Sequence, residues 1–168
     1  MKKFLAILAV LCLLCCTAFA EEANYVINMD AIPEGYTLEQ ESYNGELYYT
    51  FTSEKEDMPV YYGSVAFSEI FDGYTLSVEN LTDEEKAQVE ELFSGDLNAP
   101  EFDFSRKTTH GTDLIIMRET GAESGTVEIV TIWQGYFITI GVYTEGEVTA
   151  EMIDMAITIL SDLWVVSK

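Results

Sequence analysis

The sequence is short of histidine and cysteine, and this shortage excludes several kinds of site. Among its 168 residues there is one histidine, His110, and the three cysteines Cys12, Cys15 and Cys16 all lie within residues 1–20. Structural zinc sites use four protein ligands, mostly cysteine and histidine, and catalytic zinc sites usually use three. The chain beyond residue 20 has too few of these ligands for zinc, and it has no cysteine for a disulfide. We expect no metal and no cofactor.

Positive charge is equally scarce. Eight lysines and arginines stand against 30 acidic residues, which gives a net charge of −22. Nucleic acids and anionic lipid headgroups are bound through lysine and arginine, so we expect no nucleic-acid partner. Disorder is also excluded, because 48% of the residues are hydrophobic and 12% are aromatic. The ordinary explanation of such acidity is a solubilising surface, and the alternative is attraction of a cationic partner or of loosely held Ca²⁺.

Residues 1–20 have the three parts of a cleavable signal peptide. Two lysines follow the first methionine, residues 4–16 form an unbroken apolar run, and small residues, Ala18 and Ala20, precede the expected cleavage point. The run is shorter than the roughly 20 residues needed to span a bilayer. We therefore expect the signal to be removed and no transmembrane segment to remain.

Cleavage after Ala20 would leave 148 residues with a net charge of −24, because two of the eight basic residues lie in the signal. A lipoprotein signal is the alternative, but leucine or cysteine precedes each cysteine where a small residue is normal. We expect an extracellular or cell-envelope location, which is the periplasm if the cell is Gram-negative. Residues 21–34 are interpreted as an N-terminal leader and residues 35–168 as a single domain, long enough for its own core.

The expected elements follow the order strands, helix, strands, helix. Alternating and β-branched runs predict strands over 36–43, 46–53, 60–71, 74–78, 113–119, 126–134 and 136–144, with a loop over 98–103. Asn44-Gly45 and Gly135 mark tight hairpin turns, which make neighbouring strands antiparallel. The strands over 126–134 and 136–144 are rich in valine and isoleucine, so we expect them at the centre of the sheet.

Two helices complete the pattern. Thr82 and Glu85 form a capping box at the start of the first, and Gly95 can end it. Thr149 caps the second, whose apolar residues recur at steps of three and four: Ile153, Ala156, Ile157, Leu160, Leu163 and Trp164. Helices that follow runs of strands indicate an α+β fold. We expect a mostly antiparallel sheet of about six strands with two helices packed on it.

Four features together resemble the Mog1/PsbP-like proteins, a group that includes exported bacterial proteins of the DcrB type. These are the Pro-Glu-Gly-Tyr opening at 33–36, the Asn-Gly hairpin at 44–45, the hairpin through Trp-Gln-Gly-Tyr at 133–136, and the helix ending at 159–164. The resemblance covers about 30–166 and is one of element order. It implies the α+β fold, but it identifies no functional residue, since the group is largely non-enzymatic and its members bind different partners.

Catalytic motifs are weak. His110 lies in a polar segment, 108–113, that offers hydroxyls and a carboxylate, yet a solvated histidine is ordinary in such a loop. The serine within 121–125 is displaced by one position from a nucleophile elbow. Thirty acidic residues guarantee some close carboxylate pairs, so pairs of this kind carry no signal for glycoside cleavage. We predict no catalytic residue.

Aromatic residues give the remaining candidate site. We expect Tyr48, Tyr62, Trp133 and Tyr143 to lie on the face of the sheet opposite the helices, where exposed rings can stack on sugars or grip a peptide. The leading hypothesis is a secreted or envelope-associated, non-enzymatic domain that binds a protein, peptide or small ligand. The alternatives are a hydrolase using acidic residues or His110, and an accessory subunit of an envelope complex.

Overall fold

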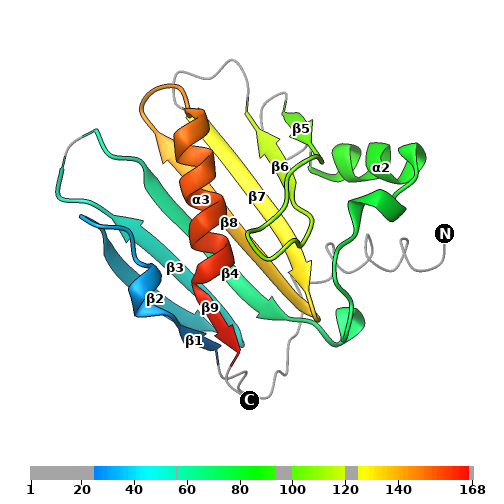
Figure 1. Cartoon of the computed structure of the whole chain (residues 1–168), viewed down its shortest axis with the longest axis horizontal. Coiled ribbons are helices and arrows are strands. Elements are labelled where there is room, and N and C mark those ends of the chain that lie inside the picture. Colours follow the sequence, from blue (N-terminus) through cyan, green and yellow to red (C-terminus); the bar gives the residue numbers. More distant parts are fainter. Residues whose placement is uncertain (1–24, 56, 94–99, 120–124, 167–168) are drawn as a thin grey trace.

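One antiparallel sheet of seven strands organises the chain (Figure 1). The computed structural model describes residues 25–55, 57–93, 100–119 and 125–166, so the expected signal peptide lies outside the described residues. The strands, in spatial order, are β2 (Thr37–Tyr43), β3 (Glu46–Thr52), β4 (Val60–Phe67), β8 (Tyr136–Thr144), β7 (Gly125–Trp133), β6 (Ile115–Arg118) and β5 (Glu101–Asp103). The expected α+β class is confirmed, and β8 and β7 lie inside the sheet as expected.

A separate two-stranded ribbon joins the two ends of the described chain. β1 (Tyr25–Ile27) pairs antiparallel with β9 (Trp164–Val166), and a 3₁₀ turn, Met29–Ala31, follows β1. The Asn28 amide donates to the Leu163 carbonyl at 2.8 Å, which fixes the segment after β1 against the end of the last helix. Residues 25–34, the described part of the segment 21–34 that was interpreted as a leader, therefore contain a strand that pairs with β9.

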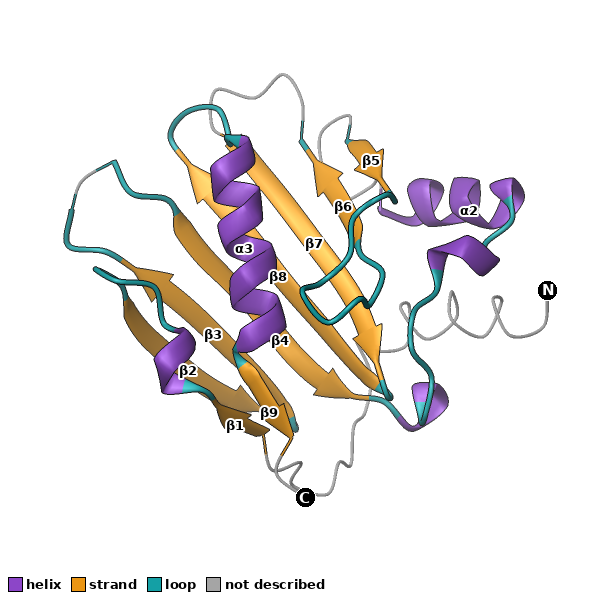
Figure 2. Cartoon of the chain, viewed as in Figure 1, coloured by secondary structure: helices purple, strands orange, loops and turns teal. Residues whose placement is uncertain are grey.

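Helix α3 (Ala150–Asp162) lies across one face of the sheet (Figure 2). The Thr149 hydroxyl accepts a hydrogen bond from the Met152 amide at 3.3 Å, so the expected cap is present. The buried residues of α3 are Ile153, Ala156, Ile157, Ile159, Leu160 and Ser161. Most of them join a core cluster with Phe51 and Val127 on the strands beneath. Trp164, expected on the helix, lies in β9 instead, with its ring 5.2 Å from that of Tyr49.

Helix α2 (Asp83–Phe93) lies beside the β5–β6 end of the sheet (Figure 1), and its Val89 packs against the face opposite α3. Its capping box is confirmed: the Glu85 amide donates to the Thr82 hydroxyl at 3.2 Å, and the Thr82 amide donates to the Glu85 carboxylate at 2.8 Å. Val89 joins a second core cluster with Met117 and Val130, whose side chains point away from α3. The two helices thus lie toward different faces of the sheet, so neither face lies opposite both of them.

Three segments differ from the expected strands. β4 ends at Phe67, and residues 69–71 form a 3₁₀ turn. Residues 74–78 are not a strand, although the Leu76 amide donates to the Ile132 carbonyl of β7 at 2.8 Å. Glu101–Asp103, expected as a loop, pairs with β6 as β5.

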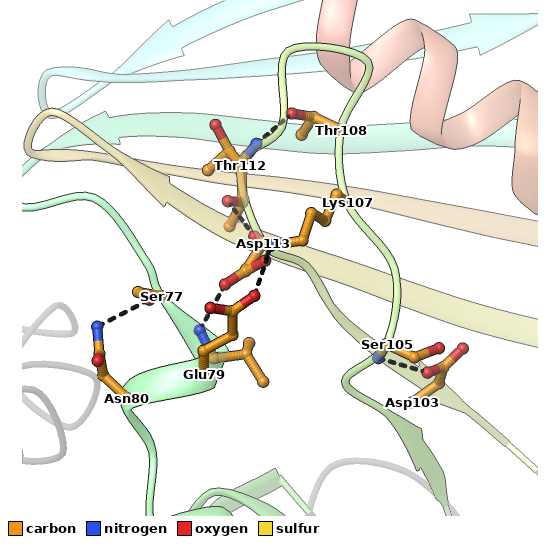
Figure 3. Close-up of polar contacts among 11 residues, drawn as sticks. Ser77, Glu79, Asn80, Asp103, Ser105, Lys107, Thr108, Thr112 and Asp113 are labelled. Atoms are coloured by element: carbon orange, nitrogen blue, oxygen red, sulfur yellow. Dashed lines mark hydrogen bonds and ion pairs between the residues drawn. The ribbon is translucent and has the colours of Figure 1, made fainter.

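Asp113 holds the segment 74–78 against the start of β6 (Figure 3). Its buried carboxylate accepts the Val78 amide at 2.7 Å and lies 2.5 Å from the Lys107 ammonium. The bond to Asp113 raises the pKa of Lys107. The Thr131 hydroxyl donates to the Asp113 carbonyl at 2.8 Å. Asp113 is therefore occupied in holding the fold together.

Candidate functional site

The candidate site lies on the side of the sheet opposite α3, over the strands that α2 does not reach. Side chains along a strand alternate between the two faces, and paired residues of neighbouring strands share a face. The core cluster on this side contains no residue of β2, β3 or β4. We call this surface the open face. It consists of Thr37, Glu39, Glu41, Tyr43, Glu46, Tyr48, Thr50, Thr52, Val60, Tyr62, Ser64, Ala66, Thr139, Gly141 and Tyr143, with Glu128 of β7 beside them.

Three of the four aromatic residues selected from the sequence share the open face. Tyr48 on β3 pairs with Ser64 on β4, two positions from Tyr62. Tyr62 in turn pairs with Gly141 on β8, two positions from Tyr143. Diagonal neighbours of this kind lie about 7–8 Å apart, within reach of aromatic side chains. Tyr48 and Tyr143 are each 43% exposed.

A fourth tyrosine extends the line and was missed by the sequence analysis. Tyr43 on β2 pairs with Glu46, two positions from Tyr48, and it is 64% exposed. The sequence does indicate its position, because the two-residue turn at 44–45 makes the two flanking residues a cross-strand pair. Counting outward from that turn places Tyr43 and Tyr48 on the same face. We call Tyr43, Tyr48, Tyr62 and Tyr143 the tyrosine diagonal.

Trp133 does not belong to this site. It pairs with Tyr136, which pairs with Phe67, and all three lie on the α3 side of the sheet. There the half-buried indole packs against the main core cluster. The expectation that Trp133 shares a face with Tyr48 and Tyr62 is therefore wrong.

Carboxylates hold two of the tyrosine hydroxyls. The Tyr48 hydroxyl donates to the Glu46 carboxylate at 2.7 Å, and this bond raises the pKa of Tyr48 to about 12. The Tyr62 hydroxyl donates to the Glu128 carboxylate. Burial, followed by that bond, raises the pKa of Tyr62. Both side chains are therefore neutral phenols at physiological pH, with a glutamate side chain fixed beside each ring.

A glycine lets the Tyr62 ring lie flat on the sheet. A Cβ atom at Gly141 would lie 2.3 Å from the Cζ atom of Tyr62, closer than real side chains allow. Gly141 also pairs with Glu128 on its other side, so Tyr62 reaches across the glycine to the carboxylate. Burial raises the pKa of Glu128, and the bond from Tyr62 opposes that effect. An aromatic ring stacked over a strand glycine also restores contacts that the glycine lacks.

The open face carries charge of one sign. Glu39, Glu41 and Glu46 lie on it, and Glu128 adjoins it. The lysines and arginines within the described ranges lie elsewhere: Lys55 in the loop after β3, Lys86 on α2, Arg106 and Lys107 in the loop after β5, and Arg118 on the α3 side of β6. Rings beside carboxylates form a surface suited to a cationic group, which is attracted by both.

His110, the other candidate from the sequence, lies far from this arrangement in the fold. Its side chain is 72% exposed, and its Nε2 atom is 3.6 Å from a carboxylate oxygen of Asp162 at the end of α3. The neighbouring Thr109 amide donates to the Ser161 hydroxyl at 3.0 Å. These contacts fasten the loop to α3. No group of acidic, histidine or cysteine side chains within the described residues could hold a metal ion.

Comparison with known proteins gives one structural likeness. No protein-family model matches the chain, and no curated protein matches its sequence significantly. The solution structure of cyanobacterial PsbP (CyanoP) from Synechocystis sp. PCC 6803 is similar at 11% identity and a TM-score of 0.44, over 90% of this chain and 97% of that one. This likeness supports a weak resemblance to Mog1/PsbP-like proteins, and at this identity and TM-score it says nothing about function. In the described part of the chain, no helix has the length and apolarity to cross a bilayer.

Proposed function

We propose that this protein is an exported, non-enzymatic domain that binds a protein or peptide partner through the open face. Export rests on the signal-like residues 1–20, and partner binding rests on the tyrosine diagonal. Protein-binding surfaces are enriched in tyrosine, because the ring offers a large contact area at low entropic cost. Three exposed rings, those of Tyr43, Tyr48 and Tyr143, along one diagonal of the sheet are the observation that carries the proposal.

The hydrolase alternative has less support. His110 is exposed beside the Asp162 carboxylate, and Asp113 is occupied by Val78 and Lys107. Glu128 has the raised pKa that is typical of a general acid, but burial beneath a tyrosine explains it as well. An accessory role in an envelope complex is one form of the proposed function, in which the partner is a resident subunit.

Affinity capture with matched surface variants tests the proposal. Protein expressed from the full chain is isolated after export and cross-linked to envelope proteins, and each captured partner is identified and its affinity measured. Tyr48→Ala combined with Tyr143→Ala removes two exposed rings without opening the core. Met155→Ala, a 40% exposed position on α3, is the matched control on the other side of the sheet.

We expect the double tyrosine variant to weaken the identified complex about tenfold or more, as loss of aromatic contacts at the centre of an interface does. Met155→Ala should leave the affinity within about twofold. Circular dichroism must show that the variants stay folded. A partner that binds all three proteins equally well would refute the proposed role of the open face.

A further inference from the structure

Among the described residues, no strand pairs with the outer edge of β2. Within the described ranges β2 pairs with β3 alone, over seven residue pairs from Thr37 to Tyr43. Six of its seven residues are exposed, and Leu38 is half-buried against the core. The opposite edge of the sheet, β5, has three residues. β2 is thus the longer of the two edges at which another strand can be added.

The hairpin turn determines which backbone groups of β2 face outward. Asn44 and Gly45 have φ angles of 51° and 80°, as in a type I′ turn. In such a two-residue hairpin the flanking residues exchange both hydrogen bonds, and bonded and non-bonded pairs then alternate along the ladder. Tyr43, Glu41, Glu39 and Thr37 therefore bond to β3. The amide and carbonyl groups of Leu38, Gln40 and Ser42 point to the free edge.

Natural proteins usually block such an edge with lysine, proline or a bulge. β2 contains neither lysine nor proline, and its pairing with β3 runs without interruption. What it carries instead is negative charge, with Glu39 and Glu41 on the open face beside Tyr43. The edge is therefore open to hydrogen bonding and selective in charge.

We propose that the β2 edge docks an extended, lysine- or arginine-bearing segment of a partner protein as an added strand. This inference rests on the proposed function and specifies its partner chemistry. Outward groups of Leu38, Gln40 and Ser42 bond to the backbone of the segment. Basic side chains on the open-face side of the segment lie next to Glu39 and Glu41, with their aliphatic stems along the ring of Tyr43.

A second copy of this chain fits the edge poorly. Antiparallel pairing of two β2 strands about Gln40 places Glu39 of each copy opposite Glu41 of the other. Like charges directly opposite each other destabilise a strand pair. The net charge of −22 adds general repulsion between copies. A cationic segment reverses both effects.

Peptide binding to the exported protein tests the inference. The probe is a fluorescein-labelled heptapeptide of alternating lysine and threonine, followed by fluorescence anisotropy. A lysine-proline peptide of equal charge lacks the amide groups that a strand needs, and a glutamate-threonine peptide has the opposite charge. We expect each control peptide to bind about tenfold more weakly or worse, and the lysine-threonine complex to weaken with salt.

Gln40 supplies a matched pair of variants. Gln40→Pro removes an amide that faces the free edge and leaves the bonds to β3 intact, whereas Gln40→Ala keeps the amide. We expect Gln40→Pro to weaken peptide binding about tenfold and Gln40→Ala to change it less than twofold. Equal affinities of the two variants, equal binding of the lysine-proline peptide, or no binding by the wild type would overturn the inference.

Amide hydrogen exchange gives a second readout that does not depend on the fold of the proline variant. Saturating lysine-threonine peptide should slow exchange at Leu38, Gln40 and Ser42 at least about tenfold. Unchanged exchange there, with peptide bound elsewhere, overturns the edge proposal. If the double change at Tyr48 and Tyr143 weakens partner capture while Gln40→Pro does not, the edge is wrong and the proposed function stands. If the protein forms a dimer that Gln40→Pro dissociates, the β2 edge binds a second copy of the chain and the partner-segment inference is overturned.

Discussion

A single added methyl group at Gly141 tests the geometry of the open face. The Cβ atom of Gly141→Ala would lie 2.3 Å from Cζ, 2.6 Å from Cε2 and 2.7 Å from the hydroxyl of Tyr62. Carbon atoms pack best at about 3.5–4.0 Å, so the ring must move by roughly 1 Å. Its hydroxyl is held by Glu128, and the movement therefore breaks that hydrogen bond.

The expected cost has two parts. Overpacking costs about 1–3 kcal/mol, and loss of a hydrogen bond to a charged group costs about 1.5–3 kcal/mol. Replacing glycine by alanine recovers about 0.4–1 kcal/mol by restricting the unfolded chain. We expect a net loss of about 3 kcal/mol in the free energy of unfolding, which lowers the melting temperature by about 10 °C for a domain of this size.

Gly141→Ala combined with each of two changes at Tyr62 separates the overpacking cost from the hydrogen-bond cost in urea denaturation. In Tyr62→Ala the ring is gone, so Gly141→Ala should cost less than about 0.5 kcal/mol. In Tyr62→Phe the ring remains without its hydroxyl, so the overpacking cost of about 1–3 kcal/mol should persist. Gly63 offers a contrast, because a Cβ atom there would lie 2.1 Å from the Thr139 carbonyl oxygen. That oxygen belongs to the backbone, so removal of a side chain cannot relieve the clash. The reasoning fails if Gly141→Ala is tolerated in the wild type, or if its cost is unchanged in Tyr62→Ala.

Three other predictions concern the core, the Asp113 anchor and pH. Leu163→Ala should lower the free energy of unfolding by about 2–5 kcal/mol, because the side chain is 0% exposed. Met155→Ala should change the free energy of unfolding by less than about 0.5 kcal/mol. Equal effects of the two variants in urea denaturation would contradict the docking of α3 on the sheet. Asp113→Ala should cost about 1–3 kcal/mol in the same assay, because it leaves the buried Val78 amide unpaired, and a neutral result would refute the anchor. Burial raises the pKa of the Glu128 carboxyl group above 4.5 in the folded protein. The contribution of this group to stability therefore falls as the pH rises through its raised pKa. Glu128→Gln should therefore gain stability relative to the wild type between pH 4 and 7 in parallel melting curves, and a constant difference would count against the shift.

Local chemistry decided what could be predicted from the sequence. Both helix caps, Thr82 with Glu85 and Thr149, need only residues within one turn of each other. The hairpins at 44–45 and 134–135 are fixed by two residues each, and both have positive φ angles at the turn. These turns also set the pairing of the strands that follow them. The antiparallel core of the sheet was therefore predictable.

The missed features depend on contacts between distant parts of the chain. β1 gains its pairing from β9, across more than 130 residues, so nothing near Tyr25 announces a strand. Trp164 continues the helical spacing of α3, but pairing with Ile27 draws it into β9. Nothing local indicates which face α2 covers. The error at Trp133 was avoidable, because its place two and four residues after Thr131 and Ile129 already assigns it to their face.

Alternating amide exchange along β2 tests the free edge most directly. In the unliganded protein we expect protected amides at Glu39, Glu41 and Tyr43, which bond to β3, and exchange at Leu38, Gln40 and Ser42 that is at least about tenfold faster. Hydrogen exchange resolved by residue with NMR measures both groups in one experiment. Uniform protection along β2 would show that its outer edge is already covered. Uniformly fast exchange would show that β2 is not paired with β3. Either result contradicts a β2 strand that is paired on one side and free on the other.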